Sequence, residues 1–322
     1  MQLLSVRNLN VTYRLRDRQV YALRNVNLSI EPGLSLGVVG ESGSGKSTLA
    51  LLRLLPKGTL VSGEAILSGD DLLSLPEERL RAIRWEKLSV VFQNNMSALS
   101  PVHRIGHQLQ DVYRLHRRDA APEMAKARVI ELLGKVGLSP HVYRAYPHEL
   151  SGGMMQRVSI AMSLLFTPSL LILDEATTAL DVITQGQILD EIERLSLEFH
   201  LTRLLITHDV SIVYRYCPRI AVLYAGQVME TGDTERILNR PSHPYTKGLL
   251  EALPTLDGPK EAPRSILGTL PDLTADHPGC LFAPRCPLAA PRCETETPPL
   301  VPKEDGRAVA CFAVSRTGGE RA

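Results

Sequence analysis

The chain has 322 residues, 44% of them hydrophobic, and its 36 Lys and Arg residues against 35 Asp and Glu residues leave a net charge of +1. Such a chain can build a sizeable core in one large domain with an appendage or in two domains, which excludes disorder for most of its length. The near-neutral charge also excludes an overall basic field that would draw the protein to nucleic acid.

The sequence predicts neither a membrane-spanning helix nor an export signal. No apolar run reaches the roughly 18 residues that a membrane helix needs, and the nearest candidate, residues 158–173, is interrupted by Thr167 and Pro168. The N-terminus alternates like a β-strand and has no charged leader followed by an apolar core. We therefore expect a cytoplasmic protein.

The N-terminal region is predicted to form antiparallel strands, because apolar residues alternate at 3–6, 10–13 and 26–30. Tyr13 on the second of these strands is a candidate for stacking on a nucleotide base. Tyr21 is the rival candidate, and for Tyr13 simple packing within a strand is the alternative role.

A phosphate-binding loop is predicted at 40–47, between an apolar strand at 34–39 and a helix over 46–55. Its sequence, GESGSGKS, puts glycines where the backbone must approach a β-phosphate closely. Lys46 would neutralise the β- and γ-phosphate oxygens, and Ser47 would coordinate Mg²⁺.

A buried strand is predicted at 88–92, and Gln93 at its end is an amide that could contact Mg²⁺ or water. Residues 97–150 then become helical in character and are predicted to form an inserted helical subdomain. One face of a helix in this segment carries five apolar residues: Ala125, Val129, Leu132, Leu133 and Val136.

A second phosphate-binding element is predicted in the segment LSGGMMQR at 150–157. Ser151, Gly152 and Gly153 offer a hydroxyl and unhindered backbone amides. A helix expected to begin at about Met154 would point its positive end outward. Two phosphate-binding elements in one chain imply a shared site.

Two carboxylates, Asp174 and Glu175, follow the fully apolar strand 170–173, so they lie at the carboxyl end of a predicted parallel strand. Asp174 would hold the Mg²⁺ shell, and Glu175 would orient or deprotonate the attacking water. His208 ends the next predicted strand, 203–207, at the same edge, where its imidazole could reach the γ-phosphate.

From residue 241 onward the composition changes to a proline-rich, loop-rich extension that contains four of the five cysteines. Cys280, Cys286, Cys293 and Cys311 are separated by five, six and seventeen residues, which is wider than the paired spacing typical of zinc sites. In a reducing cytosol such a group indicates metal thiolates before disulfides. Cys217 stands apart and is expected to be a small buried residue.

Six features, in their order along the chain, resemble the ATP-binding subunit of an ABC transporter. They are the phosphate loop, Gln93, the 150–157 segment, Asp174 with Glu175, the Ala-Leu-Asp run ending at Asp181, and His208. The resemblance covers residues 1 to about 240. It implies an α/β fold, namely an ABC-type ATPase core with a mostly parallel sheet and an antiparallel β subdomain, an inserted helical subdomain at about 97–150, and a loop-rich extension at 241–322.

The family resemblance also implies the site residues. Two nucleotide domains pair head to tail, so that each ATP lies between the phosphate loop of one and the 150–157 signature of the other, with Asp181 at the interface. The residues implied to bind nucleotide are Tyr13, Gly40, Ser42, Gly43, Ser44, Gly45, Lys46, Ser47, Thr48 and Gln93. Those implied to contact the partner's ATP are Ser151, Gly152, Gly153 and Gln156.

Several segments, including 177–182, 224–232, 243–250 and the cysteine-bearing 282–287, are more narrowly similar to the ATPase subunits of bacterial dipeptide and oligopeptide importers. Two departures occur: Asn94-Asn95 replaces a usual aspartate and proline, and Ala176 replaces a usual proline. The first lies where a membrane subunit docks in that group. The second should leave catalysis intact.

This resemblance implies an ATPase, using ATP and Mg²⁺, that powers peptide import from the cytoplasmic face of the membrane. Its partners would be a second, identical or related ATPase subunit, two membrane permease subunits and an extracytoplasmic binding protein, with no nucleic acid. A [4Fe–4S] cluster on the four cysteines is implied as well, with zinc or free thiols as alternatives. Nickel, glutathione or another small solute remains an alternative cargo, and a soluble ABC ATPase acting on nucleic acid or ribosomes remains an alternative function.

Overall fold

The computed structural model describes residues 2–50, 55–92, 99–178, 180–252 and 266–314. The chain divides into two compact units: unit 1 comprises residues 1–3, 31–34 and 74–205, and unit 2 comprises residues 4–30, 35–73 and 206–322. Across the described part of the chain, no helix is both long enough and apolar enough to cross a membrane.

The elements of unit 1 are α1 (Glu77–Ile83), β6 (Leu88–Val91), α2 (Ile105–His116), α3 (Pro122–Lys135), η3 (Pro140–Arg144), η4 (Pro147–Glu149), α4 (Gly152–Ser163), β7 (Leu170–Asp174), α5 (Val182–Phe199) and β8 (Thr202–Ile206), whose last residue falls in unit 2. Those of unit 2 are β1 (Leu4–Arg14), β2 (Gln19–Ile30), β3 (Ser35–Val39), η1 (Lys46–Ala50), β4 (Leu60–Leu67), β5 (Asp70–Asp71), α6 (Val210–Tyr216), β9 (Arg219–Tyr224), β10 (Gln227–Asp233), α7 (Thr234–Asn239), α8 (Pro244–Glu251), η5 (Ala283–Arg285), α9 (Pro291–Thr295), β11 (Val301–Pro302) and β12 (Ala308–Val309).

Strand β1 joins two of the predicted N-terminal strands into one, and it pairs antiparallel with both β2 and β4. The register shifts between Val6 and Leu9, where Asn8 adopts a φ of +47°. A bulge of this kind lets a strand continue through a local bend. The prediction of an antiparallel subdomain is therefore confirmed, with one bulged strand in place of two short ones.

The second sheet of unit 2 has the order β11-β12-β10-β9-β3. Strand β3 is parallel to β9, and the β9–β10, β10–β12 and β11–β12 pairs are antiparallel. All five residues of β3 are buried, as expected of a strand covered on both faces. Helix α6 covers one of these faces so closely that a Cβ at Gly37 would lie 2.2 Å from Cγ1 of Val213.

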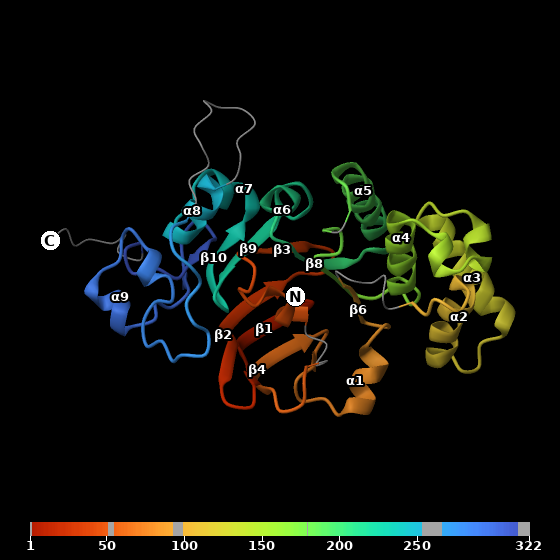
Figure 1. Cartoon of the computed structure of the whole chain (residues 1–322), viewed down its shortest axis with the longest axis horizontal. Coiled ribbons are helices and arrows are strands. Elements are labelled where there is room, and N and C mark those ends of the chain that lie inside the picture. The colour runs from red at the N-terminus through yellow and green to blue at the C-terminus, as the bar shows by residue number, and fades with distance from the viewer. Residues whose placement is uncertain (1, 51–54, 93–98, 179, 253–265, 315–322) are drawn as a thin grey trace. The chain divides into compact units, whose positions relative to one another are not determined.

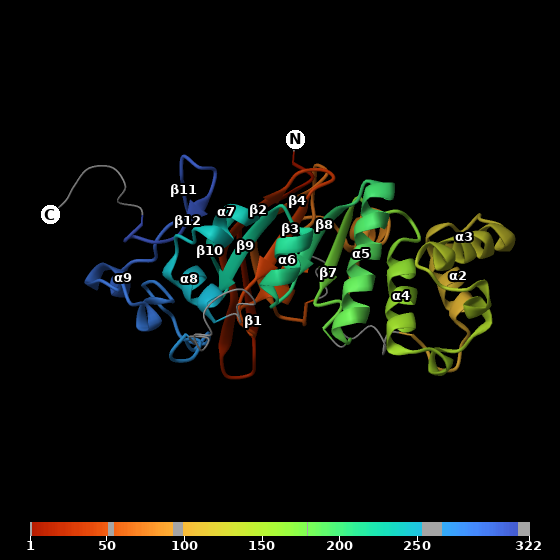
Figure 2. The same cartoon turned by 90° about the horizontal axis from the view of Figure 1, so that it is seen from above.

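In unit 1, β6 and β7 form a parallel pair, and α4 and α5 run side by side (Figures 1 and 2). Helices α2 and α3 form the predicted helical subdomain. All five residues of the predicted apolar face on α3 and its C-cap are fully buried. The pattern of apolar residues therefore located this helix and its buried side.

Two helix predictions differ from the structure in extent. Helix α4 begins at Gly152, two residues before the expected start, because the Ser151 hydroxyl caps it by accepting from the Met154 amide at 3.3 Å. The segment after the phosphate loop forms the 3₁₀-helix η1 over Lys46–Ala50. Residues 51–54 of the expected longer helix lie outside the described residues.

The C-terminal extension continues the core of unit 2. Strand β12 pairs with β10, with Val309 opposite Glu230. Figures 1 and 2 show the extension beside β10 and α8. Three fully buried rings fill the junction: Tyr224, Tyr245 and Phe282 have centroids 4.6 to 5.4 Å apart. Burial of such large side chains is worth several kcal/mol, so the extension is held by a core of its own.

A buried carboxylate also fastens the extension. Glu230 on β10 is fully buried and accepts from the backbone amides of Ser242 (3.0 Å) and His243 (2.9 Å) ahead of α8. Its third partner is the guanidinium of Arg307, at 3.6 Å. A buried charge needs such compensation, because desolvation alone would make it unfavourable.

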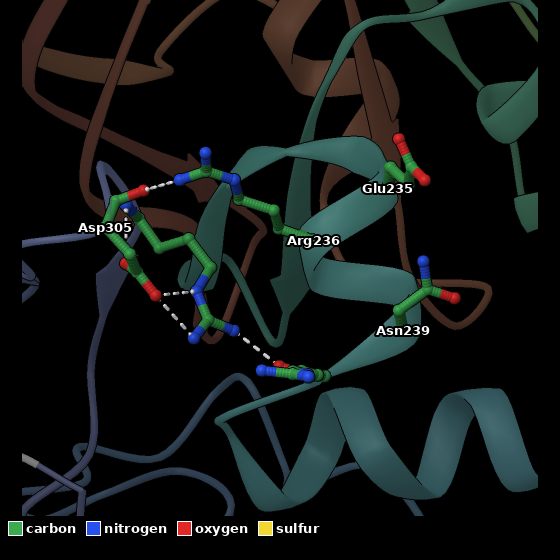
Figure 3. A pocket seen from close by; sticks show the side chains of 6 residues that line it. Glu235, Arg236, Asn239 and Asp305 are labelled. Atoms are coloured by element: carbon green, nitrogen blue, oxygen red, sulfur yellow. Dashed lines mark hydrogen bonds and ion pairs between the residues drawn. The ribbon is translucent and has the colours of Figure 1, made fainter.

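An open pocket of about 500 Å³ lies at the junction and is drawn in Figure 3. It is lined by Glu235, Arg236, Asn239, Arg240, Asp305 and Arg307. Arg307 donates to the carboxylate of Asp305 and to the backbone carbonyl of Arg240, while Arg236 donates to the Asp305 carbonyl at 2.7 Å. These contacts tie α7 to the β11–β12 hairpin, and none of the predicted site residues lines the pocket.

We expect the stability of this junction to fall in acid because of His243. Burial lowers the pKa of His243 to about 4 from 6.5, partly offset by a hydrogen bond with the Ala310 backbone, and its Nδ1 accepts from the Tyr245 amide at 3.0 Å. Between these pH values the unfolded chain binds a proton that the folded chain excludes. Stability is therefore full above pH 6.5 and declines by up to about 1.4 kcal/mol per pH unit below it.

Urea unfolding followed by circular dichroism at several pH values measures this decline. The variant His243→Asn retains a side chain that can cap α8 and should show a flatter pH dependence than the wild type. The exposed His148→Asn is the matched control and should retain the wild-type slope. A steep slope in His243→Asn would assign the decline to other groups.

Candidate functional site

In unit 2, the phosphate loop follows β3 directly, and its glycines are required by the chain's own backbone. A Cβ at Gly40 would lie 2.0 Å from the carbonyl oxygen of Leu223, and one at Gly45 would lie 2.2 Å from that of Ala22. Gly45 also has a φ of +90°. Any larger residue at either position would force the loop away from β2 and β9. The sequence predicted these glycines from the approach of a phosphate, and the fold adds this second reason.

Lys46 is the buried cation of the loop, with 5% of its surface exposed. Its Nζ donates to the carbonyl oxygens of Gly40 at 2.8 Å and Glu41 at 2.9 Å. The loop therefore curls around the ammonium group. The hydroxyls of Ser42 and Ser47 belong to exposed residues of the loop, whereas Ser44 is fully buried and its Oγ has no hydrogen-bond partner.

Tyr13 and Tyr21 have different environments, which distinguishes the two candidates for stacking on a base. The Tyr13 hydroxyl is hydrogen-bonded to Oγ1 of Thr48 at 3.1 Å, so this ring is tied to the end of the phosphate loop. The Tyr21 ring is covered by the guanidinium of Arg24, whose Cζ lies 4.4 Å from the ring centroid. The geometry favours Tyr13, because its ring position is fixed by the loop.

His208 lies at the same edge of the unit 2 sheet as the phosphate loop. The amide of Thr207 donates to the carbonyl of Val38 at 3.1 Å, so the segment that carries His208 runs beside the end of β3. His208 is exposed, and the next residue, Asp209, caps α6 by accepting from the Ser211 amide at 2.8 Å. The expected proximity of His208 to the loop is present within this unit.

In unit 1, Asp174 and Glu175 lie at the carboxyl end of β7, as predicted. Asp174 is the last residue of the strand and is 6% exposed. Glu175 is more exposed and has a φ of +47°, a left-handed conformation that is uncommon for a residue other than glycine. Its carbonyl accepts from the Thr178 amide and hydroxyl. Strain of this kind, of order 1 kcal/mol, is often found at functional positions because it directs a side chain away from the strand.

The signature segment forms the N-terminus of α4. Ser151 is exposed at the N-cap, and Gly152 and Gly153 form the first turn. A Cβ at Gly153 would lie 3.0 Å from Cγ2 of Thr184 at the start of α5. Asp181 caps α5 with a 2.9 Å hydrogen bond from the Thr184 amide, and its hydrogen bonds with Thr184 lower the pKa of Asp181. The structure thus brings the helix N-termini of α4 and α5 together.

Gln156 differs from the other predicted signature residues. Its side chain is 5% exposed, and its Nε2 is buried without a hydrogen-bond partner. Its burial places the side chain on the face of α4 that packs into unit 1. The contact of Gln156 with the partner's ATP stays a prediction.

Some residues of the prediction lie outside the described residues, namely Gln93, Ala179, and Asn94 and Asn95, which replace the usual aspartate and proline. Of the predicted Mg²⁺ ligands, Ser47 belongs to unit 2 and Asp174 to unit 1.

The four clustered cysteines lie in one module of unit 2. None of the five cysteines forms a disulfide, and Cys217 is buried as predicted. The Cys280 amide donates to the Cys293 carbonyl at 2.7 Å. Burial raises the pKa of Cys280 to about 11 and also raises that of Cys286, and the thiols of Cys293 and Cys311 contribute. Among the described residues, no three His, Cys, Asp or Glu side chains are placed to hold a single metal ion.

One site residue was not predicted from the sequence. Glu41, the second residue of the phosphate loop, is paired with Arg285 of the extension. These residues are 244 positions apart, and nothing in the local sequence of either one indicates the other. The segment 282–287, which contains Arg285, resembles peptide-importer ATPases, but that resemblance does not indicate a contact with the loop.

Comparisons with known proteins cover both the core and the extension. Residues 23–178 match the family model described as ABC transporter, and residues 229–293 match the model described as oligopeptide/dipeptide transporter, C-terminal region. The chain is 43% identical to the oligopeptide transport ATP-binding protein OppD of Escherichia coli (strain K12), over 96% of this chain and 93% of OppD. The chain belongs to the ABC transporter family.

Other similar proteins agree with this membership. The oligopeptide transport ATP-binding protein AppD of Bacillus subtilis (strain 168) is 40% identical over 99% of both chains. Among solved structures, a dimer of the ATP-binding cassette MJ0796 bound to ADP and Pi has a TM-score of 0.64 and 30% identity, covering 72% of this chain and 98% of that one. The predicted ABC-type α/β fold and ATPase activity are confirmed by these similarities.

Proposed function

We propose that this ABC ATPase powers the import of oligopeptides or dipeptides across the cytoplasmic membrane through partner membrane subunits. The observation that carries the proposal is that the similarity includes the extension. The oligopeptide/dipeptide C-terminal model matches residues 229–293, beyond the ATPase core, and OppD is similar over 96% of the chain. A similarity confined to the core would support only ATP hydrolysis.

In the proposed site, Lys46 binds the β- and γ-phosphate oxygens, and Tyr13 stacks on the base. The remaining residues of the loop, Gly40, Ser42 to Gly45 and Thr48, would surround the phosphates with amides and hydroxyls. Ser47, Gln93 and Asp174 would hold Mg²⁺, which neutralises charge on the phosphate oxygens when bound. The oxygen donors of this set are the kind that Mg²⁺ prefers.

Hydrolysis in this proposal uses Glu175 as the general base. Its carboxylate takes a proton from water, the water oxygen forms a bond to the γ-phosphorus, and the bond from that phosphorus to the β–γ bridging oxygen breaks, leaving ADP and phosphate. His208 would hydrogen-bond the γ-phosphate and orient it. The exposed position of His208 and the left-handed backbone of Glu175 support these roles.

The signature residues would act on the ATP of a second subunit. Ser151, Gly152 and Gly153 stand at the accessible end of α4, and Asp181 at the exposed end of α5. A helix N-terminus with free amides is suited to binding a phosphate from outside the chain. We infer that the partner is a second ABC ATPase, either a further copy of this chain or a related one.

The remaining partners follow from the transport function. Two membrane permease subunits would receive the motion of the helical subdomain at about 97–150, and an extracytoplasmic binding protein would deliver the peptide. The chain would work as a peripheral protein on the cytoplasmic face of the membrane. In this proposal the chain consists of a nucleotide-binding domain at 1–240 joined to the extension at 241–322.

Purification of the tagged chain from its native membranes tests this assignment. We expect two membrane proteins to co-purify with it and its ATPase rate to rise with transported peptide. Stimulation by nickel or glutathione in place of peptide would identify a different cargo for the same motor. Tight, salt-sensitive binding of nucleic acid without membrane partners would contradict the proposal.

We also propose that Cys280, Cys286, Cys293 and Cys311 bind a [4Fe–4S] cluster. The cysteines are separated by five, six and seventeen residues, which is wider than the paired spacing of zinc sites. Each iron of such a cluster takes one thiolate, so the cluster would bring the four thiols of this module together. The mutual effect of these thiols on their pKa values is consistent with such a module.

Metal analysis of anaerobically purified protein tests the cluster. We expect about four iron and four acid-labile sulfide per chain, as the cluster formula requires, and loss of both in a Cys286→Ser variant. Cys217→Ser is the matched control, because that buried thiol lies outside the module. Zinc at one per chain, or neither metal, would refute the proposal.

A further inference from the structure

We propose that Arg285, in the C-terminal extension, is a positioning residue of the phosphate loop, which it holds through Glu41 in the form that binds ATP. The inference rests on the proposal that this loop is the ATP site. It assigns to the extension a part in nucleotide binding, in addition to its cysteine module.

The extension holds Glu41 at both its side chain and its backbone. Nη1 of Arg285 donates to the two carboxylate oxygens of Glu41, at 3.1 Å each. The backbone amide of Glu41 donates to the hydroxyl of Tyr245 at 3.0 Å. Glu41 directly follows Gly40, so these contacts fix the first turn of the loop from outside the loop itself.

Arg285 is itself rigidly placed. Its side chain is 6% exposed, its Nε and Nη2 donate to the carbonyls of Leu267 (2.9 Å) and Ile266 (3.1 Å), and its guanidinium lies over the ring of Tyr224. Burial lowers the pKa of Arg285, but hydrogen bonds to Tyr224 and Glu41 more than offset it. The guanidinium therefore stays charged, and it has no freedom to leave Glu41 without losing four other contacts.

The contact extends from Glu41 to the phosphate-binding cation. The carbonyl of Glu41 accepts from Nζ of Lys46, so a displaced Glu41 would also displace an acceptor that orients this lysine. A second part of the extension approaches the loop at Leu270, whose Cδ1 lies 3.6 Å from the Cβ position of Gly43. The loop is therefore contacted at Glu41 and at Gly43 by residues beyond 240.

Arg285 also compensates the negative charge of Glu41. A carboxylate within an anion-binding loop repels the phosphates that the loop must bind, unless a cation pairs with it. Glu41 is such a carboxylate, and its side chain is 27% exposed beside the loop. Arg285 neutralises it. Removal of Arg285 would therefore leave both a loosened loop and an uncompensated negative charge near the phosphates.

Equilibrium binding of ATP to the full chain tests this role by comparing four variants with the wild type. We expect Arg285→Ala to weaken ATP binding about tenfold, the change expected from loss of one charge-assisted hydrogen bond. Arg285→Ala combined with Glu41→Gln should recover most of this loss, because the unpaired charge is gone. Arg285→Lys retains the positive charge but not the planar guanidinium with its several donors, and its affinity for ATP should fall about threefold. Arg292→Ala, which breaks an exposed pair with Glu296 in the same extension, is the matched control.

The outcomes separate this inference from the proposed function. If Lys46→Ala binds ATP as the wild type does, the loop is not the ATP site and the proposed function fails. If Lys46→Ala loses binding but Arg285→Ala and Arg285→Lys keep wild-type affinity, only the inference is overturned. It is also overturned if Glu41→Gln rescues nothing, because a merely structural role of Arg285 would not respond to the charge on residue 41. In the assembled transporter, Arg285→Ala should raise KM for ATP and leave kcat nearly unchanged.

Discussion

Replacement of Glu175 by Gln is expected to reduce the ATPase kcat of the assembled complex by about 10² to 10⁴, the usual contribution of a general base. The amide keeps the shape of the side chain but cannot accept the proton of the attacking water. Because Glu175 does not itself hold the phosphates, ATP affinity should stay near the wild-type value. Steady-state phosphate release and equilibrium ATP binding, measured on the same preparations, separate the two effects.

A matched substitution keeps this result specific. Glu64→Gln makes the same chemical change at an exposed carboxylate that pairs with Arg7 on the antiparallel sheet, and it should leave kcat unchanged. Wild-type hydrolysis by Glu175→Gln would show that another group activates the water, and it would remove the main role that we assign to the end of β7.

The second large effect is expected at the junction between the core of unit 2 and the extension. Glu230→Gln should destabilise this junction by about 3 kcal/mol, because the substitution leaves the buried Arg307 without one of its carboxylates and weakens two amide hydrogen bonds ahead of α8. Such a loss corresponds to roughly a hundredfold change in the opening equilibrium. Hydrogen exchange of peptides that cover β10, α8 and β12 measures it directly.

The control for this prediction is Glu251→Gln on α8. This carboxylate pairs with Lys247 at 3.9 Å on the surface, and exposed pairs of this type contribute at most about 1 kcal/mol. Exchange in the same peptides should therefore resemble that of the wild type. Equal protection in Glu230→Gln and Glu251→Gln would mean that the buried carboxylate does not fasten the extension.

The parts of the fold that the sequence predicted well are those with a strong local pattern. Strands β3 and β7 are mostly apolar with all residues buried, and the apolar face of α3 repeats at helical spacing. The phosphate loop and the carboxylates at the end of β7 are indicated by short runs of neighbouring residues. Local chemistry is sufficient for such features, because the interactions that form them are themselves local.

The features that the sequence did not predict depend on contacts between distant residues. The pairing of Glu41 with Arg285 and the addition of β12 to β10 join segments that lie far apart in the chain. The burial of the Gln156 side chain on α4 is also set by packing against other elements. The periodicity of apolar residues indicates a helix, but tertiary packing decides whether a single polar side chain on it is buried or exposed.

ATP-dependent uptake of a labelled oligopeptide is the most direct test of the central claim. The measurement uses proteoliposomes that contain this chain with its co-purified membrane subunits, and the binding protein is added on the opposite side. We predict uptake that requires ATP, disappears with Glu175→Gln and falls at limiting ATP with Arg285→Ala. Uptake that proceeds equally with Glu175→Gln, or ATP hydrolysis that moves no peptide in the complete system, would contradict the account.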